Sequence, residues 1–187
     1  MKKALSLVLA AVMAFSLVAC GGSSSSTASA GNAGSASGSA TASNVTVQIG
    51  PNPESIDPAL NSTIDGGNML ITAFEGLLIV DENNQVQPGQ AESWEVSEDG
   101  LTWTFHLREG LKWSDGTDLD ATDFVYTYKR VADSDTAAPY SQTAVGMIAG
   151  YDEAMAGNPD ALQVEAPDAN TFIVHLSYPC TYFDKLA

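Results

Sequence analysis

The stretch AESWEVSEDGLTWTFHLREGLKWSDGTDLDATDFVYTYKR, residues 91–130, decides the fold that we expect for this chain. Apolar and polar residues alternate through Leu101–Leu107, which is the period of a half-buried β-strand. A second alternating run ends at Val96, and the turn residues Asp99-Gly100 stand between the two runs. Two alternating runs separated by a short turn are typical of a β-hairpin, so the sequence predicts one here.

A helix is predicted directly after this hairpin and its turns. Asp120 stands three residues before Asp123, which nearly matches a capping box with Asp in place of Glu or Gln. Phe124, Tyr128 and Val131 then follow at helical spacing. We therefore expect an amphipathic helix from Ala121 to about Val131. Carboxylates at the start of a helix are explained by capping, and hairpin and helix together offer no catalytic group.

Further runs predict elements on both sides of this stretch. The expected elements are strands at Val45–Ile49 and Leu77–Val80, helices at about Gly67–Phe74 and Ile148–Ala156, a hairpin from Leu162–Glu165 and Thr171–Leu176, and the start of a helix at Pro179–Ala187. The three tryptophans, Trp94, Trp103 and Trp113, have the shape to stack on a sugar or peptide, but their spacing favours packing in core and turns.

The charge balance excludes one large class of partners. The chain carries 7 Lys and Arg against 23 Asp and Glu, for a formal net charge of −16. Nucleic-acid binding depends on Lys and Arg contacts to phosphates, so we expect no nucleic-acid partner. The balance suits a soluble, exported protein that repels anionic surfaces, although a merely solvated acidic surface explains the charge equally well.

The cysteines and histidines form no metal-binding pattern. Only Cys20 and Cys180 are present, and no Cys/His/Asp group has zinc spacing, so neither a metal nor a cofactor is expected. His106 and His175 fall on predicted strands and are interpreted as strand-face residues. We expect Cys180 to be a small, partly buried thiol without a disulfide partner.

The N-terminus has the pattern of a bacterial export signal. Residues 1–19 combine Lys2-Lys3 with an apolar run too short for a comfortable membrane span. The run ends Leu17-Val18-Ala19-Cys20, which resembles a lipobox whose cysteine becomes the lipidated mature N-terminus; the alternative is an ordinary signal peptide with an incidental cysteine. Acyl chains there would anchor the protein to the membrane. Residues 20–43 are almost entirely Gly, Ser, Ala and Thr, which predicts a flexible tether.

Several short words in order resemble the solute-binding proteins of the oligopeptide and dipeptide class of ABC importers, family 5. The words are Phe74-Glu75-Gly76-Leu77-Leu78, Pro88-Gly89 with Ala91-Glu92-Ser93-Trp94, Trp103-Thr104-Phe105-His106-Leu107-Arg108, Lys112-Trp113-Ser114-Asp115-Gly116 and Asp123-Phe124-Val125-Tyr126. The resemblance covers residues 45–187. It implies an α/β fold (mixed α+β) of the type II periplasmic-binding-protein class.

The resemblance also implies a division into lobes. Members have three lobes, with the second inserted after the first helix of lobe one. On that template, residues 44–74 open lobe one and residues 75–187 form most of lobe two, while the rest of lobe one and all of lobe three are absent. We therefore expect an N-terminal fragment of a longer protein.

The same resemblance suggests ligand-contacting residues. The loop Asn61-Ser62-Thr63-Ile64 matches the position of a family loop that lines the ligand cleft, so Ser62, Thr63 and Ile64 are candidate contacts; an ordinary strand-to-helix connection is the alternative. Ala137-Ala138-Pro139-Tyr140-Ser141 resembles the family word ASPY, with Ala138 in place of its Ser. Tyr140 is therefore either a ligand contact or a packing tyrosine.

Three functions follow from these readings. The first is a monomeric binding lipoprotein that captures an oligopeptide or dipeptide outside the cytoplasmic membrane and passes it to an ABC permease. The second, a secreted hydrolase, lacks Gly-x-Ser-x-Gly and His-Glu-x-x-His motifs, so no enzymatic activity is expected. The third is a surface sensor on the same fold. The resemblance leaves the solute open, because relatives also take nickel chelates, haem and oligosaccharides.

Overall fold

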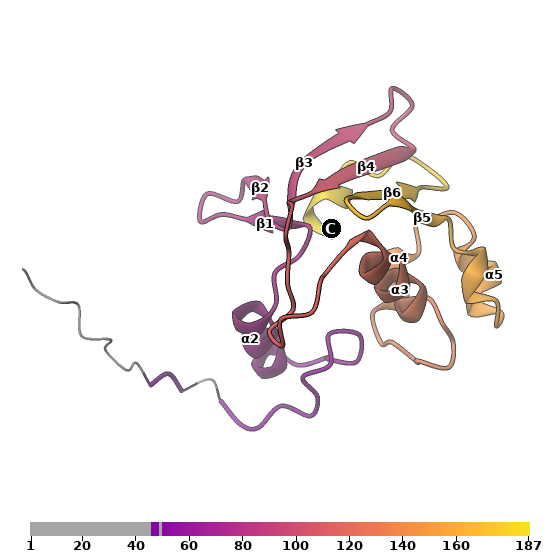
Figure 1. Cartoon of the computed structure of the whole chain (residues 1–187). Coiled ribbons are helices and arrows are strands. Elements are labelled where there is room, and N and C mark those ends of the chain that lie inside the picture. Colours follow the sequence, from indigo (N-terminus) through magenta and orange to yellow (C-terminus); the bar gives the residue numbers. More distant parts are fainter. Residues whose placement is uncertain (1–45, 49) are drawn as a thin grey trace, which may run out of the picture. The chain divides into compact units, whose positions relative to one another are not determined.

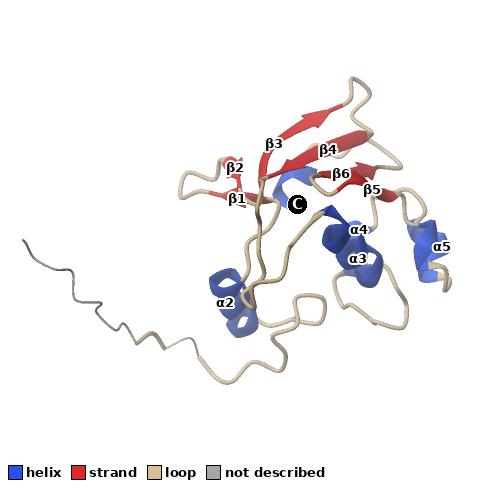
Figure 2. Cartoon of the chain, in the orientation of Figure 1, coloured by secondary structure: helices blue, strands red, loops and turns tan. Residues whose placement is uncertain are grey.

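The main sheet contains four antiparallel strands. A computed structural model describes residues 46–48 and 50–187, and all structural statements below concern this part of the chain. The strands run in the order β3-β4-β6-β5 and are drawn in red in Figure 2. They are β3 (Ala91–Val96), β4 (Thr102–Leu107), β5 (Val164–Asp168) and β6 (Thr171–His175). Both predicted hairpins are confirmed, and pairing between β4 and β6 joins them into one sheet.

The inner face of β4 forms the centre of the core. Trp103, Phe105 and Leu107 are buried, while the residues between them are partly exposed, as the period of two predicted. Phe105 is fully buried and stands opposite Phe172 of β6, with ring centroids 6.2 Å apart. Phe183 completes this aromatic cluster at 6.4 Å from Phe105. Trp94 packs against the core, so two of the three tryptophans have the packing role favoured by their spacing.

Helix α3 (Ala121–Val131) covers part of this sheet and has the predicted bounds. Its first turn is closed by the predicted capping box: the Thr122 amide donates to Asp120 Oδ1 at 2.8 Å, and the Asp120 amide donates to Asp123 Oδ2 at 3.0 Å. Two side chains on its inner face, Phe124 and Tyr128, lie 5.8 and 5.1 Å from the Phe172 ring. Figure 1 shows α3 beside β5 and β6.

The remaining elements are short. Strands β1 (Leu78–Val80) and β2 (Val86–Pro88) form a separate antiparallel pair, and the chain also contains helices α4 (Ser141–Val145) and α5 (Tyr151–Met155) and the 3₁₀ turns η1 (Pro159–Ala161) and η2 (Phe183–Lys185). The strand predicted at Leu77–Val80 is thereby confirmed. The five-residue α5 is shorter than the helix predicted at Ile148–Ala156.

Two features explain why α5 begins late. Ile148 forms a β-bridge with Leu176, just past the end of β6, so its backbone is already paired. Gly150 then has a φ of 83°, a left-handed conformation that cannot continue a helix. A Cβ at this position would also lie 2.0 Å from the carbonyl oxygen of Ala161, so only glycine fits.

Two further predictions are wrong in the described part of the chain. Residues 46–48 of the strand predicted at Val45–Ile49 are not in a strand, and the two end residues lie outside the described part. An alternating run becomes a strand only when it finds a hydrogen-bonding partner, and none of the described residues pairs with it. The helix predicted at Pro179–Ala187 is only the 3₁₀ turn η2, which the buried Phe183 attaches to the core.

Helix α2 (Ile64–Ala73) is largely exposed or only partly buried. It begins three residues before the predicted start, because Thr63 serves as its N-cap, and it ends at Ala73 with Phe74 as its C-cap. Only Gly66 is buried, whereas Ile64 and Ile71 are 84% and 81% exposed. The apolar side chains of α2 therefore have little cover from the described residues.

Backbone segments far apart in sequence meet beside β1. The Leu77 amide donates to the carbonyl oxygen of Ala187 at 3.1 Å, and the Ala91 amide donates to that of Leu77 at 3.0 Å. Gly89 is required here, because a Cβ at this position would lie 2.7 Å from the Gly76 oxygen. Leu77 and Ala187 therefore lie next to each other. We call the backbone contacts among Gly76, Leu77, Gly89, Ala91 and Ala187 the neck.

Candidate functional site

The predicted ligand loop is an ordered helix entry. Asn61 Oδ1 accepts hydrogen bonds from the Thr63 amide and hydroxyl at 3.3 and 3.2 Å, and Asn61 Nδ2 donates to the Thr63 carbonyl oxygen at 3.0 Å. Thr63 Oγ1 accepts from the Gly66 amide at 3.2 Å, which caps α2. The hydroxyl, amide and carbonyl oxygen of Thr63 are therefore all engaged in the local hydrogen bonding of this helix entry.

The other predicted contact residues present their side chains to solvent. Ser62 is exposed, and Ile64 is 84% exposed. Tyr140 stands immediately before α4, is 58% exposed, and makes no side-chain capping bond to that helix. No hydrogen bond joins Tyr140 to residues 61–64 within the described part of the chain. The ligand roles of Ser62, Thr63, Ile64 and Tyr140 therefore stay predictions.

An ion pair joins the segment that leads into this loop to helix α3. Arg130 Nη1 donates to Asp57 Oδ1 at 2.9 Å, and Arg130 Nη2 donates to Asp57 Oδ2 at 2.6 Å. The two side chains are 33% and 30% exposed. The hydrogen bonds from Arg130 lower the pKa of the Asp57 carboxyl, and the Ala59 amide, which donates to the same carboxylate, lowers it further. Asp57 is thus held in its charged form.

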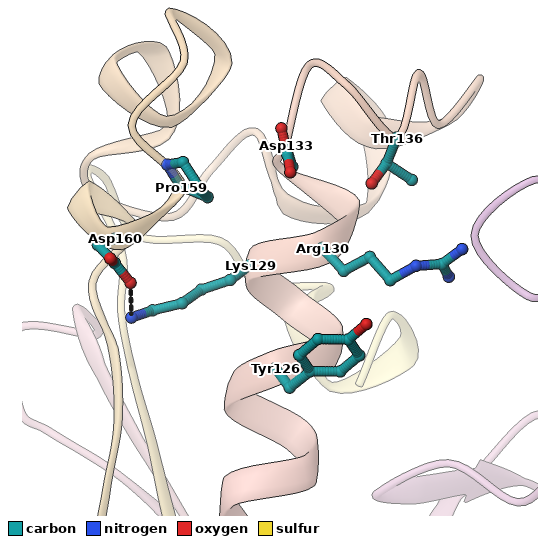
Figure 3. Close-up of a pocket in the computed structure, with 7 residues that line it drawn as sticks. All are labelled: Tyr126, Lys129, Arg130, Asp133, Thr136, Pro159 and Asp160. Carbon is teal, nitrogen blue, oxygen red and sulfur yellow. Dashed lines mark hydrogen bonds and ion pairs between the residues drawn. The ribbon is translucent and has the colours of Figure 1, made fainter.

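A hollow lies along the outer side of α3 (Figure 3). It has a volume of about 320 Å³ and is lined by Tyr126, Lys129, Arg130, Asp133, Thr136, Pro159 and Asp160. Lys129 Nζ donates to Asp160 Oδ1 at 2.8 Å across one end, and Arg130 points toward Asp57. Both cations are already paired, and none of the four predicted ligand contacts lines this hollow.

His175 joins two polar side chains on the sheet. Thr102 Oγ1 lies 3.2 Å from His175 Nδ1, and His175 Nε2 lies 3.2 Å from Glu165 Oε1. These three groups stand on neighbouring strands, as predicted for a strand-face histidine, and they line neither the hollow beside α3 nor a second one near α5. No group of three potential metal ligands occurs among the described residues.

Of the two cysteines, Cys180 lies in the described part of the chain and Cys20 does not. Cys180, predicted to be a partly buried thiol, is a buried free thiol that is 5% exposed. The lipidation site Cys20, the signal segment and the tether lie outside the described residues. Among those residues, no helix is long and apolar enough to cross a membrane.

The sequence did not reveal the partnership of Asp57 with Arg130. In the sequence, Asp57 stands directly before Pro58, and Arg130 is the last charged residue of the helix predicted from Ala121 to about Val131. An aspartate before proline, whose carboxylate caps the next backbone amides, is a recognisable turn signal. Its partner is 73 residues away, and one sequence contains no signal for such a distant pair.

Comparison with known proteins assigns the family. The sequence model of the bacterial extracellular solute-binding proteins, family 5 (middle region), matches residues 85–187, which is more than half of the chain. The chain belongs to this family. The family 5 resemblance read from the sequence is therefore confirmed, and the family comprises substrate-binding proteins, not enzymes, as the missing catalytic motifs predicted.

Curated family 5 relatives are similar over most of this chain. The periplasmic oligopeptide-binding protein OppA of Salmonella typhimurium is 47% identical over 140 residues, covering 73% of this chain and 26% of the relative. OppA of Escherichia coli is 44% identical over 140 residues, again covering 73% of this chain and 26% of the relative. The chain thus spans about a quarter of the length of these relatives.

Solved structures of family 5 members confirm the fold class. Haemophilus influenzae OppA, in complex with RPPGFSPFR, is 39% identical with a TM-score of 0.68, covering 72% of this chain and 27% of that one. The murein tripeptide-binding protein MppA of Escherichia coli is 36% identical with a TM-score of 0.66, covering 70% of this chain and 26% of that one. The mixed α/β, periplasmic-binding-protein-like fold is therefore confirmed.

Proposed function

We propose that this chain is part of a peptide-binding protein of an ABC importer, which captures oligopeptides or dipeptides outside the cytoplasmic membrane and delivers them to a permease. The observation that carries the proposal is the 47% identity to an oligopeptide-binding protein over 140 residues. The relatives compared above are named for peptides, which favours peptide over a nickel chelate, haem or oligosaccharide.

In the proposed complex, the extended peptide is held chiefly through its main chain. The entry to α2 carries the candidate contacts Ser62, Thr63 and Ile64, and the exposed ring of Tyr140 offers an apolar surface with a hydroxyl at its end. Residues 44–74 begin the first lobe, and residues 75–187 form most of the second. The missing lobes, in a longer polypeptide, complete the enclosure when a hinge motion closes it.

The proposed location is outside the cytoplasmic membrane, with Cys20 as the lipid anchor and residues 21–43 as the tether. Support comes from the sequence Leu17-Val18-Ala19-Cys20 and from the composition of the tether. Two or more acyl chains are needed for stable anchoring. In cells, Cys20→Ala should release the protein from the membrane fraction, and an unlipidated mass for the wild-type N-terminal peptide would contradict the anchor.

Calorimetry with a defined peptide pool tests the function. The complete polypeptide should bind peptides, and a pool of free amino acids at equal mass serves as the matched control. The 187-residue chain should bind the same pool far more weakly, because a ligand held on one side keeps much of its surface wet and still loses translational and rotational freedom. Equal, tight binding by the short chain would contradict the proposed lobes, and binding of neither pool by the complete polypeptide would contradict peptide capture.

A further inference from the structure

The segment with the predicted ligand residues has one polar attachment to the rest of the described chain. The two hydrogen bonds between Arg130 and Asp57 are the only ones that join residues 50–74 to residues 75–187 in this part. The segment buries little else, since Gly66 is the only buried residue of α2. The orientation of residues 50–74 therefore depends strongly on this pair.

A series of hydrogen bonds continues from Asp57 into the loop. Asp57 Oδ1 accepts from the Ala59 amide at 2.9 Å, and the Asp57 carbonyl oxygen accepts from the amides of Leu60 and Asn61 at 3.1 and 3.0 Å. The side chain of Asn61 in turn holds both the amide and the carbonyl of Thr63, as described above. Asp57, Ala59, Leu60, Asn61 and Thr63 are thus linked by consecutive hydrogen bonds that reach the N-cap of α2.

From these contacts we propose that Arg130 is a positioning residue for the segment Asn61–Ile64 and acts through Asp57. A guanidinium that donates two parallel hydrogen bonds to one carboxylate fixes the direction of that carboxylate as well as its distance. Because Asp57 caps the backbone that follows it, fixing its carboxylate also fixes the start of the loop. That the segment contacts a ligand rests on the proposed function, whereas the attachment itself does not.

Arg130 also lies close in sequence to the other predicted contact. It is the penultimate residue of α3, and a short connection leads from there to Tyr140 through Ala137, whose φ is 51°. Thr136, which belongs to this connection, and Arg130 of α3 both line the hollow beside α3 (Figure 3). The guanidinium thus connects the segment carrying Ser62, Thr63 and Ile64 to the helix end from which Tyr140 follows.

Amide hydrogen exchange on the 187-residue chain tests the attachment without any ligand. Arg130→Ala should lower protection of the Ala59, Asn61 and Thr63 amides by about two- to fivefold, the size expected for a partly exposed ion pair. Lys129→Ala is the matched control, because it removes a neighbouring cation of α3 that pairs with Asp160. It should leave these amides unchanged.

Two more variants separate positioning from a general loss of stability. Asp57→Asn should reproduce the effect of Arg130→Ala, and the double variant should add nothing, because both remove one interaction. Arg130→Lys keeps the charge but loses the parallel hydrogen bonds, so protection should be intermediate. Unprotected loop amides in the wild type, unchanged protection in Arg130→Ala, or an equal loss in Lys129→Ala would overturn the proposal.

Peptide affinity of the complete polypeptide provides the second readout. Arg130→Ala should weaken binding of the peptide pool by about two- to fivefold, and Lys129→Ala should not. If exchange shows the attachment but the wild type binds no peptide, the proposed function fails while Arg130 remains the anchor of the loop. If exchange shows no attachment and the wild type binds peptide, the positioning role fails and the proposed function stands.

Discussion

Helices α2 and α3 differ in a way that composition does not foretell. α2 contains two isoleucines, a leucine and a methionine, yet only Gly66 is buried. α3 contains an aspartate, a lysine and an arginine, yet packs Phe124 and Tyr128 onto the aromatic core. The apolar residues of α3 recur on one side of the helix and pack against the sheet. In the described part of the chain, α2 has no sheet to pack against. Burial thus depends on periodicity and on a partner more than on apolar content.

The largest expected difference between the two regions lies in their response to loss of a large apolar side chain. Phe105→Ala should destabilise the chain by about 3–5 kcal/mol, because the ring is fully buried among Trp103, Phe172 and Phe183. Ile64→Ala, at an 84% exposed position of α2, should stay within about 0.5 kcal/mol. Urea unfolding followed by circular dichroism measures both. Similar costs for the two variants would mean that α2 is packed after all.

Removing the N-caps of α3 and α2 should give a smaller difference in stability between the two regions. Asp120→Ala removes both the acceptor for the Thr122 amide and one half of the capping box, and should destabilise the chain by about 1 kcal/mol. Thr63→Ala removes the cap of α2 and should lower amide protection within α2 while leaving the unfolding midpoint of the chain unchanged. Chemical denaturation and hydrogen exchange on the same two samples provide the measurement. A lowered midpoint in Thr63→Ala would couple the two regions.

We expect a bound peptide to contact both the entry to α2 and Tyr140, which lies on the connection that follows α3. A substitution of Tyr140 tests the second of these contacts. In the complete polypeptide, Tyr140→Ala should weaken peptide binding by about 0.5–1.5 kcal/mol, the range for aromatic contacts. Tyr178→Ala is the control, since this tyrosine is 52% exposed and is not a predicted contact. Calorimetry on folded samples decides between the two roles; unchanged affinity in Tyr140→Ala would make it a packing tyrosine.

The smallest effect concerns pH. The pKa of Asp57 is lowered mainly by the hydrogen bonds from Arg130, so the pair stabilises the folded chain at pH values above the ordinary value of about 4. This contribution, below about 1 kcal/mol, is lost as the pH falls through the lowered pKa. Amides of residues 59–63 should therefore lose protection in acid before those of β4. In Asp57→Asn that early step should be missing; its persistence there would assign the step to another carboxylate.

Local patterns predicted the elements that depend on local physics. The alternation around Phe105 specified β4, and the Asp120 and Asp123 pair specified the start of α3 to the residue. The run at Val45–Ile49 has the same alternation, but a strand needs a partner that no property of the run supplies. The helix predicted at Ile148–Ala156 begins only after Gly150, whose left-handed backbone and close approach to Ala161 depend on the tertiary fold.

The candidate site was predictable to a lesser extent. Residues 61–64 and Tyr140 came from resemblance to a family, and the structure gives them an ordered, accessible setting without testing their roles. The Asp57–Arg130 pair joins positions 73 residues apart, and only the folded chain brings them together.

The neck beside β1 has a consequence for how this region can change. Since Leu77 donates a hydrogen bond to Ala187, residues 77–187 form a loop whose two ends meet at one point. Changes of length inside that loop, away from the neck, would leave the hydrogen bond between its two ends in place. In evolution the loop can therefore lengthen or shorten without disturbing the backbone contacts that close it. Gly89 restricts that freedom at the neck itself, where a side chain would meet the backbone of Gly76.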